Sequence, residues 1–404
     1  MARDREFMKL WVGQTVSVFG SMVTRTALPF TAILVLGATP FQMGLLNAAD
    51  LLPGIALGLV AGAWVDRLRR KPILIAADLA RAALLISIPI AALASTLRIE
   101  HLYVVALLVG ACTILFDVAY LSYLPSLVPR ERLVEANARL EASASVAEVG
   151  AFGATGWLVQ WLGAPAAIVI DAVTFLFSAG SLASIRAREP DPPARSERRR
   201  RWRELIEGLR ATFSEPELRT LAGSVVIHEL SLGIGGAVFM VFVTRELGFE
   251  PGALGMFFAV GGVSAMLGAF AAAPLGARAG VYRVMIAGLV VSGLATLLVP
   301  LARGATATSA VLLIAQQLIG DAGAVIYSVH QISRRQAITP EHSRGRVNAG
   351  IRVLGLSLAL VGALGGGLLA EAFGLRSVLV LAGCARIVAG SWLVVGRRGI
   401  ESKR

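Results

Sequence analysis

The chain has 404 residues, of which 56% are hydrophobic and 16% are charged, and its formal net charge is +12. The apolar residues come in runs of about 20, a length that crosses the roughly 30 Å hydrocarbon core of a bilayer. This composition excludes an ordinary soluble chain of two or three domains. Because lipid offers no partner to backbone groups, each run is expected to form a helix.

We expect twelve membrane-spanning helices, with both termini on the same side of the membrane. Their approximate ranges are 10–36, 41–64, 72–95, 101–125, 137–161, 165–186, 219–244, 252–274, 282–302, 308–332, 347–370 and 376–396. Of the Lys and Arg residues, only Arg98, Arg245, Arg303 and Arg376 fall in loops on the opposite side. The positive-inside rule therefore makes the side of the termini cytoplasmic. The basic charge reports topology and argues against nucleic-acid binding.

The stretch from Gly62 to Lys71 lies between the second and third predicted helices and concentrates charge, with Asp66, Arg67 and Arg70 among its residues. A charged cluster between two long apolar runs is expected where the chain leaves the membrane and returns. We therefore predict a cytoplasmic turn at this stretch.

The two halves of the sequence are related by a shift of 211 residues, which is the signature of an internal duplication. The shift places Pro40 on Pro251, and Gly44 on Gly255. Further matches are Gly156 with Gly367, Gly163 with Gly374, and Asn137-Ala138 with Asn348-Ala349. We therefore predict two six-helix halves with the same orientation, at 1–186 and 219–404. The second copy of the charged turn keeps an arginine but has Ala277 in place of the acid.

The segment 187–218 connects the two halves and is rich in basic residues. Prolines near its start cannot continue a helix. Apolar residues then recur at helical spacing, at Trp202, Leu205, Ile206, Leu209 and Phe213. This pattern predicts an amphipathic helix on the cytoplasmic leaflet, with Arg198 to Arg201 facing anionic lipid. The alternative interpretation is a solvated linker.

The pattern Gly62-x-x-x-Asp66-Arg67-x-Arg69-Arg70-Lys71 resembles the signature between helices 2 and 3 of major facilitator transporters. Arg69 stands where that signature has a second glycine, and the second copy keeps this glycine as Gly280. With the predicted spans, the duplication and the basic linker, the resemblance covers essentially the whole chain. It implies an all-α membrane protein of twelve helices in two pseudo-symmetric halves.

Two further segments are similar to a bacterial exporter branch of this family, which includes enterobactin exporters and macrolide-efflux proteins. One is Phe116 to Pro125 with the Ala136-Asn137 that follows, and the other is Arg344-Gly345-Arg346. Members of this branch move siderophores, drugs or secondary metabolites outward, usually driven by proton entry. The resemblance thus implies proton-coupled multidrug or siderophore efflux by an antiporter.

Arg25 and Asp50 lie at similar depth in the first and second predicted helices. An ionisable group in hydrocarbon costs about 2.5–3.5 kcal/mol or more, so each calls for a function or a partner. We interpret the two as a proton-coupled pair, in which protonation of Asp50 frees Arg25. The alternative is a static ion pair between neighbouring helices.

Arg81 and Asp117 lie at similar depth in the third and fourth predicted helices. We expect a structural bridge between them. The alternative follows from the resemblance: Asp117 pairs with Arg70 of the charged turn and locks one conformation.

Three further acids lie near the middle of predicted helices, namely Glu148, Glu229 and Asp321, and His228 precedes Glu229. In the family fold, helices 1, 4, 7 and 10 line the central cavity, which makes Glu229 and Asp321 cavity candidates. His228 titrates near neutral pH, although a lone histidine is more often a packing residue. The remaining charges, which lie nearer helix ends or on outer helices, are interpreted as structural: Asp171, Glu371 and Arg386.

Within the charged turn, we expect Asp66 to accept hydrogen bonds at the N-terminal end of the eleventh helix, near Arg346. This contact would clamp the two halves together during part of a transport cycle. Because the second copy lacks the acid, the clamp should exist on one side alone.

The sequence shows no hydrolytic or nucleotide-binding pattern, and in particular no G-x-x-x-x-G-K-[ST] loop. Its four histidines have no metal-ligand spacing. We therefore expect no enzyme activity, no metal and no cofactor, with the proton gradient as energy source. The expected partners are a small-molecule substrate and the bilayer, and the expected state is a monomer in a bacterial plasma membrane.

The leading functional hypothesis is export of a small amphipathic organic molecule by proton-coupled alternating access. One alternative is a lipid or lysolipid flippase, or a proton-independent metabolite transporter, on the same fold. A third hypothesis is a membrane sensor that binds its ligand without transport.

Overall fold

The computed structural model describes residues 5–58, 61–65, 68–187, 189 and 200–401, and these residues fold as helices joined by short turns. The chain divides into two compact units. Unit 1 comprises Met1–Ala38, Ala49–Arg198 and Pro251–Met256, and unit 2 comprises Thr39–Ala48, Arg199–Glu250 and Phe257–Arg404. The domain boundaries expected from the repeat stay a prediction.

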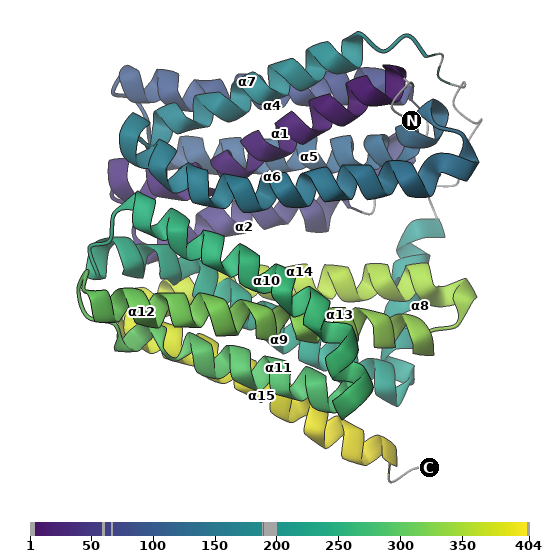
Figure 1. Cartoon of the computed structure of the whole chain (residues 1–404), viewed down its shortest axis with the longest axis vertical. Coiled ribbons are helices and arrows are strands. Elements are labelled where there is room, and N and C mark those ends of the chain that lie inside the picture. Colours follow the sequence, from purple (N-terminus) through teal and green to yellow (C-terminus); the bar gives the residue numbers. More distant parts are fainter. Residues whose placement is uncertain (1–4, 59–60, 66–67, 188, 190–199, 402–404) are drawn as a thin grey trace. The chain divides into compact units, whose positions relative to one another are not determined.

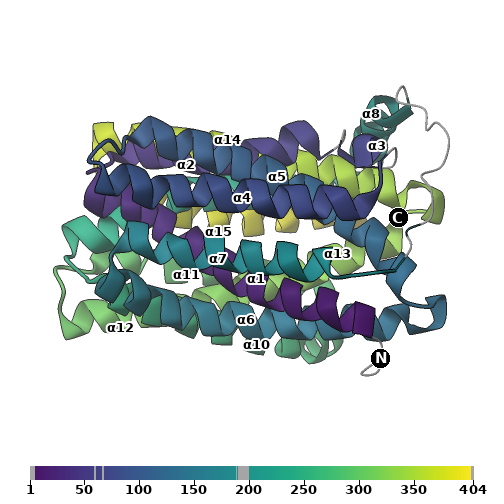
Figure 2. The same cartoon turned by 90° about the horizontal axis from the view of Figure 1, so that it is seen from above.

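Unit 1 is built on five long helices that run side by side (Figure 1; Figure 2). Its elements are α1 (Arg5–Phe30), η1 (Thr31–Val35), α2 (Pro40–Leu57, shared with unit 2), α3 (Ala61–Val65), α4 (Arg70–Leu93), α5 (Ile99–Leu127), η2 (Arg130–Arg132), α6 (Leu133–Leu162) and α7 (Ala164–Ala183). Helix α1 packs on α6 and α7, and α4 packs on α5 and α7. Phe7, Phe116 and Tyr123 are among the fully buried side chains between these helices.

Unit 2 begins with the linker helix and repeats the same packing pattern. Its elements are α8 (Arg200–Ser214), α9 (Pro216–Val241), η3 (Phe242–Glu246), α10 (Pro251–Ala279, shared with unit 1), α11 (Val281–Thr296), η4 (Val299–Leu301), α12 (Ala307–Gln316), η5 (Gln317–Asp321), α13 (Ala322–Ile338), η6 (Glu341–Ser343), α14 (Arg344–Phe373) and α15 (Leu375–Glu401). Helix α9 packs on α14 and α15, and α11 packs on α13 and α15. These pairs correspond one to one with the pairs of unit 1.

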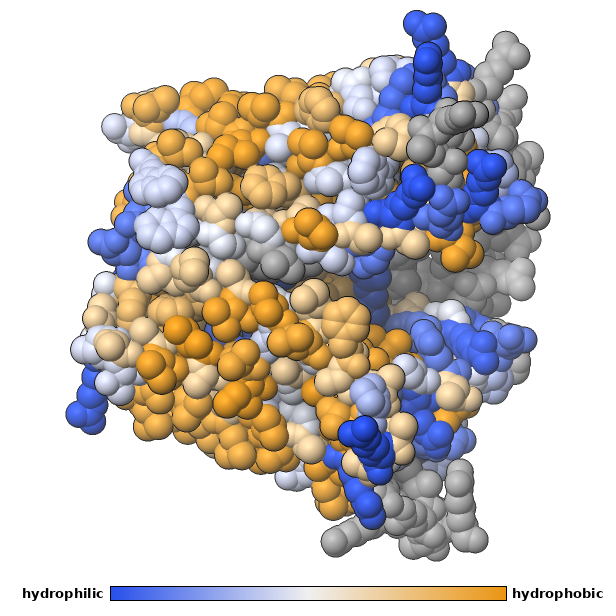
Figure 3. All heavy atoms as spheres, viewed as in Figure 1, coloured by the Kyte–Doolittle hydropathy of each residue, from blue (hydrophilic) through white to orange (hydrophobic). Residues whose placement is uncertain are grey.

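The helices are apolar on their outer surfaces, as expected in lipid. Among the described residues, ten helices are long and apolar enough to cross a membrane. On the face drawn in Figure 3, apolar side chains cover the middle of the helices and hydrophilic side chains gather near their ends. The other two predicted spans fall on α2 with α3 and on α6, which carries several ionisable residues. The count of twelve spans and the cytoplasmic termini stay predictions.

The duplication is visible in local backbone geometry. The π-helices η1 and η3 begin at Thr31 and Phe242, which the 211-residue shift relates. Glycines at related positions adopt the same left-handed conformation, with φ of 85° at Gly163 and 83° at Gly374. Only glycine adopts such a φ at no steric cost, so the repeat preserves turns as well as helices.

The repeat also preserves two helix-capping contacts. In unit 1, Gln160 Oε1 accepts a hydrogen bond of 3.0 Å from the backbone N–H of Gly252, at the start of α10. In unit 2, Glu371 Oε1 accepts one of 3.3 Å from the backbone N–H of Phe41, at the start of α2. The shift relates both pairs, and each acceptor satisfies a free N–H in the first turn of a helix.

The two copies of the charged turn differ at the position of the signature glycine. Gly280 has a φ of 87° and connects α10 directly to α11. Its counterpart Arg69 has a φ of −67° and an extended ψ, because a side chain disfavours the left-handed region. The first copy accordingly has a shorter α2, the separate helix α3 and an extended entry into α4.

Candidate functional site

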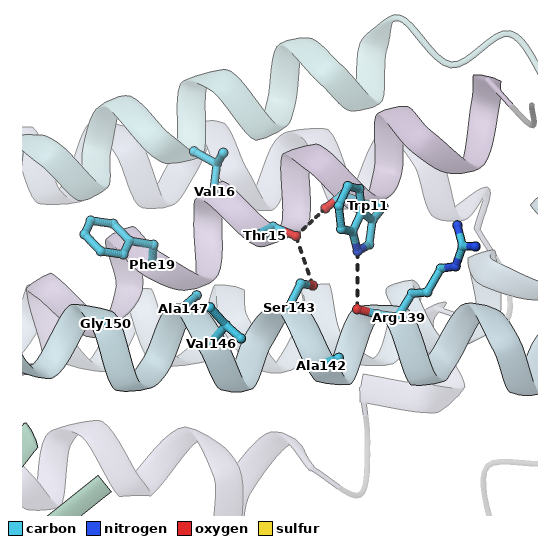
Figure 4. Close-up of a pocket in the computed structure, with 10 residues that line it drawn as sticks. All are labelled: Trp11, Thr15, Val16, Phe19, Arg139, Ala142, Ser143, Val146, Ala147 and Gly150. Atoms are coloured by element: carbon cyan, nitrogen blue, oxygen red, sulfur yellow. Dashed lines mark hydrogen bonds between the residues drawn. The ribbon is translucent and has the colours of Figure 1, made fainter. Parts of the chain in front are cut away.

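An elongated groove lies between α1 and α6 in unit 1, with a cavity volume of about 710 Å³ (Figure 4). Its lining is mostly apolar. The lining residues are Trp11, Thr15, Val16, Phe19, Arg139, Ala142, Ser143, Val146, Ala147 and Gly150.

The few polar groups of the groove largely satisfy one another. Thr15 donates to the backbone carbonyl of Trp11 at 2.8 Å and pairs with the Ser143 hydroxyl at 3.0 Å. The indole N–H of Trp11 donates to the backbone carbonyl of Arg139 at 3.3 Å. Figure 4 shows these bonds at one end of the groove and Phe19 near the other. The remaining wall can therefore accept apolar surface without leaving buried donors or acceptors unpaired.

The cationic side chain of Arg139 lies at the polar end of the groove. Arg139 forms an ion pair of 3.0 Å with Glu135, one turn earlier on α6, and both side chains are partly exposed. At the opposite end, Gly150 leaves open space, because a Cβ there would have no neighbour within 4 Å. A mostly apolar groove with a charged end suits an amphipathic ligand.

The expected coupling residues Arg25 and Asp50 lie on α1 and α2, with both side chains exposed. The charge of Arg25 acts on the Asp50 carboxylate. Within the described part of the chain, however, no hydrogen bond or ion pair joins the two side chains. Their coupling role stays a prediction, as does that of Glu148, whose side chain lies outside the described structure.

The buried cation of unit 1 is Arg81, and it is fully enclosed. It forms an ion pair with Asp78, one turn earlier on α4. Its guanidinium lies over the rings of Phe116 and Phe175, with 4.5 and 4.1 Å to their centroids. Asp117 is exposed on α5, and a pair between it and Arg81 stays a prediction.

Two residues of the charged turn, Arg70 and Lys71, contact the segment that follows α7. Glu189 accepts hydrogen bonds from the backbone N–H groups of Arg70 (2.6 Å) and Lys71 (3.2 Å), and it pairs with the Arg70 guanidinium at 3.4 Å. A carboxylate in this place complements the positive end of the α4 dipole. The other residues proposed for the gate are less defined: Asp66 and Arg67 lie outside the described residues, and Gly62 is described only as backbone within α3.

The linker helix α8 packs on the start of α14. Arg346 of α14 forms an ion pair of 2.5 Å with Glu207 of α8. A Cβ at Gly208 would lie 2.2 Å from the backbone carbonyl oxygen of Arg346, so glycine permits this close approach. Leu209, one of the apolar residues at helical spacing, packs near Gly350 of α14. The lipid contact predicted at Arg198 to Arg201 lies outside the described side chains.

The candidate cavity residues of unit 2 are held in different ways. His228 is buried on α9 and meets the ring of Tyr327 edge-on, with 5.3 Å between ring centroids. Glu229 is half-buried against Gly355 of α14. Asp321 ends the π-helix η5, with Oδ2 directed toward Gly261 of α10.

Sequence reasoning did not predict the contacts that three charged residues make. Glu189 and Glu207 lie in the linker, where nothing in the pattern of residues shows their partners. Arg386 was interpreted as structural, yet it is 8% exposed and its guanidinium donates to Ser292 (2.9 Å) and Thr296 (3.2 Å). Its place on an apolar stretch of α15 was the signal available from sequence.

The family model of the Major Facilitator Superfamily matches residues 10–242 and again residues 221–403. The uncharacterized MFS-type transporter YfiS of Bacillus subtilis (strain 168) is 27% identical over 413 residues, which cover 99% of this chain and 95% of that relative. The multidrug efflux pump Tap of Mycolicibacterium fortuitum is 24% identical over 379 residues, which cover 92% of this chain and 90% of the pump.

Solved transporters share the fold. A bacterial homologue of the iron transporter ferroportin in an inward-facing state superposes with a TM-score of 0.79 at 17% identity, covering 97% of this chain and 98% of the homologue. The nucleoside transporter NupG superposes with a TM-score of 0.77 at 13% identity, covering 97% of this chain and 98% of NupG. These proteins are transporters and not enzymes, and the apolar helices make the chain a multi-pass membrane protein. The predicted resemblance is confirmed: the chain belongs to the major facilitator superfamily.

Proposed function

We propose that this protein exports small amphipathic organic molecules across a bacterial plasma membrane by proton-coupled alternating access. The observation that carries the proposal is the apolar groove between α1 and α6. Its volume of about 710 Å³ lies within the range of roughly 300–1,000 Å³ that is common for drug-sized ligands. The similarity to a multidrug efflux pump supports the same substrate class.

The energy source in this proposal is the proton gradient, without a bound cofactor, and the working unit is a monomer. Ionisable groups within membrane helices are costly and are retained where they move protons or bind substrate. The candidates are those expected from the sequence: Arg25, Asp50, Glu148, His228, Glu229 and Asp321. The two six-helix halves predicted from the repeat would move by alternating access, with the substrate site near the middle of the membrane.

The proposed gate is the charged turn from Gly62 to Lys71 together with Arg81, Asp117 and Arg346. Two of its cations already have partners in the linker, since Glu189 contacts Arg70 and Glu207 contacts Arg346. The pair of Arg346 and Glu207 is partly exposed and can separate at modest cost, whereas that of Arg70 and Glu189 is more buried. The linker would thus hold the gate residues in one arrangement and release them in another.

The role of the groove in transport is tested by filling it with a large side chain. Gly150→Phe places a ring in open space at the apolar end, so the helix should fold while the ligand loses its room. Export should fall about tenfold, which corresponds to a loss of roughly 1.4 kcal/mol in binding. The measurement is efflux from proteoliposomes with an imposed pH gradient, using ethidium, Nile red and anilinonaphthalene sulfonate as cationic, neutral and anionic probes.

The matched control is Gly180→Phe on α7, where an added Cβ likewise meets nothing within 4 Å but the groove is not involved. This variant should export at the wild-type rate. Equal export by the two variants would remove the groove from the transport path. Transbilayer movement of a labelled lipid, independent of the pH gradient, would instead favour the flippase alternative.

A further inference from the structure

Unit 2 buries an arginine whose partners are incomplete. Arg386 lies on α15 and donates through one guanidinium nitrogen, Nη1, to the hydroxyls of Ser292 and Thr296 on α11. Its Nε atom is buried and has no hydrogen-bond partner among the described residues, as is also true of Nε of Arg81; what Arg386 lacks, and Arg81 has, is a carboxylate in ion-pair contact. Two neutral hydroxyls orient a cation but leave its charge uncompensated. A buried charge without a counter-charge is costly, which raises the question of what compensates it.

Asp321 supplies the nearby negative charge. The residues around Asp321 approach Ser292, the partner of Arg386: a Cβ at Gly320 would lie 3.9 Å from the Ser292 carbonyl oxygen, and one at Gly323 would lie 3.5 Å from the Ser292 Cβ. No ion pair within 4.0 Å joins Arg386 and Asp321 in the described structure. Neither carboxylate oxygen of Asp321 accepts a hydrogen bond from the described residues. Arg386 and Asp321 therefore lie near each other without forming an ion pair, whereas Arg81 and Asp78 form one. Below, the first is called the open pair and the second the closed pair.

The backbone at Asp321 is also exceptional. The residue ends the π-helix η5, which packs on α11, the helix that carries Ser292 and Thr296. A π-helical turn inserts an extra residue and changes the direction of the side chains that follow, and such turns often occur at functional sites. Here the carboxylate points toward Gly261, a glycine of α10 whose missing side chain leaves room for it.

The other titratable groups around the pair come from α9 and α13. His228 lies on α9, and its buried Nδ1 also lacks a partner among the described residues. Tyr327 packs on His228 and shares a hydrogen bond of 2.9 Å with Ser224. Glu229 follows His228 on α9 and is half-buried. The region thus holds two buried polar atoms without described partners, on Arg386 and His228, which a rearrangement or a water molecule would satisfy.

We infer that Asp321 is the acid that carries the transported proton and that Arg386 is its exchangeable counter-charge. When Asp321 is protonated, Arg386 donates to Ser292 and Thr296; when Asp321 has released the proton, the guanidinium pairs with the carboxylate. The proton enters from outside onto a carboxylate oxygen and leaves toward the cytoplasm, and no covalent bond other than this O–H forms or breaks. This inference rests on the proposed function and assigns its coupling step to unit 2.

The direct test needs no substrate. The protein is reconstituted in lipid vesicles, and infrared difference spectra are recorded while pH is varied. The wild type should show a protonated-carboxyl C=O band that titrates, and Asp321→Asn should lose that band whereas Asp321→Glu should retain one. In Arg386→Gln the band should persist to higher pH, because removal of the neighbouring cation favours the protonated form.

An unchanged titrating band in Asp321→Asn would overturn the inference, and so would an unchanged midpoint in Arg386→Gln. Glu341→Gln, which changes an exposed carboxylate of unit 2, is the control that should leave the band as in the wild type. Failure of the wild type to export any of the three dyes would count against the proposed function and leave the infrared result intact. The two failures are therefore distinguishable.

Discussion

Among the described residues, each unit buries one arginine, Arg81 in unit 1 and Arg386 in unit 2. The two lie on helices that the repeat does not relate to each other, and they have different partners. In unit 1, Arg81 on α4 lies over Phe175 on α7. In unit 2, the 211-residue shift places Arg386 on α15 at the position of Phe175, and Ser292 on α11 at the position of Arg81. Arg386 donates to Ser292, so the contact between the two related positions is kept while the arginine has changed sides.

The partners of the two arginines explain why one pair is static and the other can switch. The charge of Arg81 is compensated by an ion pair with Asp78 on its own helix, and two aromatic rings cover its guanidinium. Arg386 has hydroxyl partners and an acid, Asp321, that it does not contact directly. The counterpart of Asp321 in unit 1 is Gly110, so that unit lacks an equivalent acid. A duplicated fold can thus keep the place of a buried cation while giving it a carboxylate partner in one unit and hydroxyl partners in the other.

The largest effect on stability is expected at the closed pair. Asp78→Asn leaves Arg81 buried without its counter-charge, which should lower the free energy of unfolding by about 3–5 kcal/mol. Unfolding of the purified protein in mixed micelles by increasing denaturant measures the change. Glu341→Gln, at the exposed pair with Arg344, is the control and should change stability by less than about 1 kcal/mol. A similar, small effect of both variants would show that the Arg81 pair contributes little.

A smaller effect is expected at the open pair. Arg386→Leu loses two charged hydrogen bonds but also removes a buried cation that no acid contacts directly, so stability should fall by about 1–2 kcal/mol. Proton-driven export should be lost in the same variant. If Arg386→Leu destabilises the protein as much as Asp78→Asn does, the distinction between a closed and an open pair is wrong.

The smallest effect tests whether the two positions are interchangeable. The double variant Arg81→Ser with Phe175→Arg gives unit 1 the arrangement of unit 2. We expect it to be more stable than the sum of the two single changes implies, by about 1 kcal/mol, since neighbouring residues are energetically coupled. Additive losses in this double-mutant cycle would show that the two units hold their arginines by unrelated contacts.

Much of the fold follows from simple sequence features. Apolar runs of membrane length predict the helices, and the shift of 211 residues predicts the repeat, including the glycine turns at Gly163 and Gly374. The difference in backbone conformation between Arg69 and Gly280 also follows from the residue types, since only glycine enters the left-handed region freely. The π-helices were not predicted, because an apolar periodicity does not reveal one extra residue in a turn.

The candidate site was less predictable than the fold. Depth along a helix made Asp321 and Glu229 candidates for the cavity, but it does not show which face of a helix contacts which neighbour. Asp78 and Arg81 are three residues apart on one helix, a spacing at which side chains meet, so that pairing was within reach of sequence reasoning. Glu189 and Glu207 contact residues far away in the chain, and only tertiary structure brings such partners together.

The central claim is tested most directly by measuring proton movement during transport. Wild-type protein and Asp321→Asn are reconstituted in vesicles that contain the pH indicator pyranine, and an outward gradient of the exported dye is applied. The wild type should move protons inward as dye leaves down its gradient, whereas Asp321→Asn should let dye leave down its gradient but move no protons. Equal proton movement by the two proteins would contradict the assignment of the coupling step to unit 2.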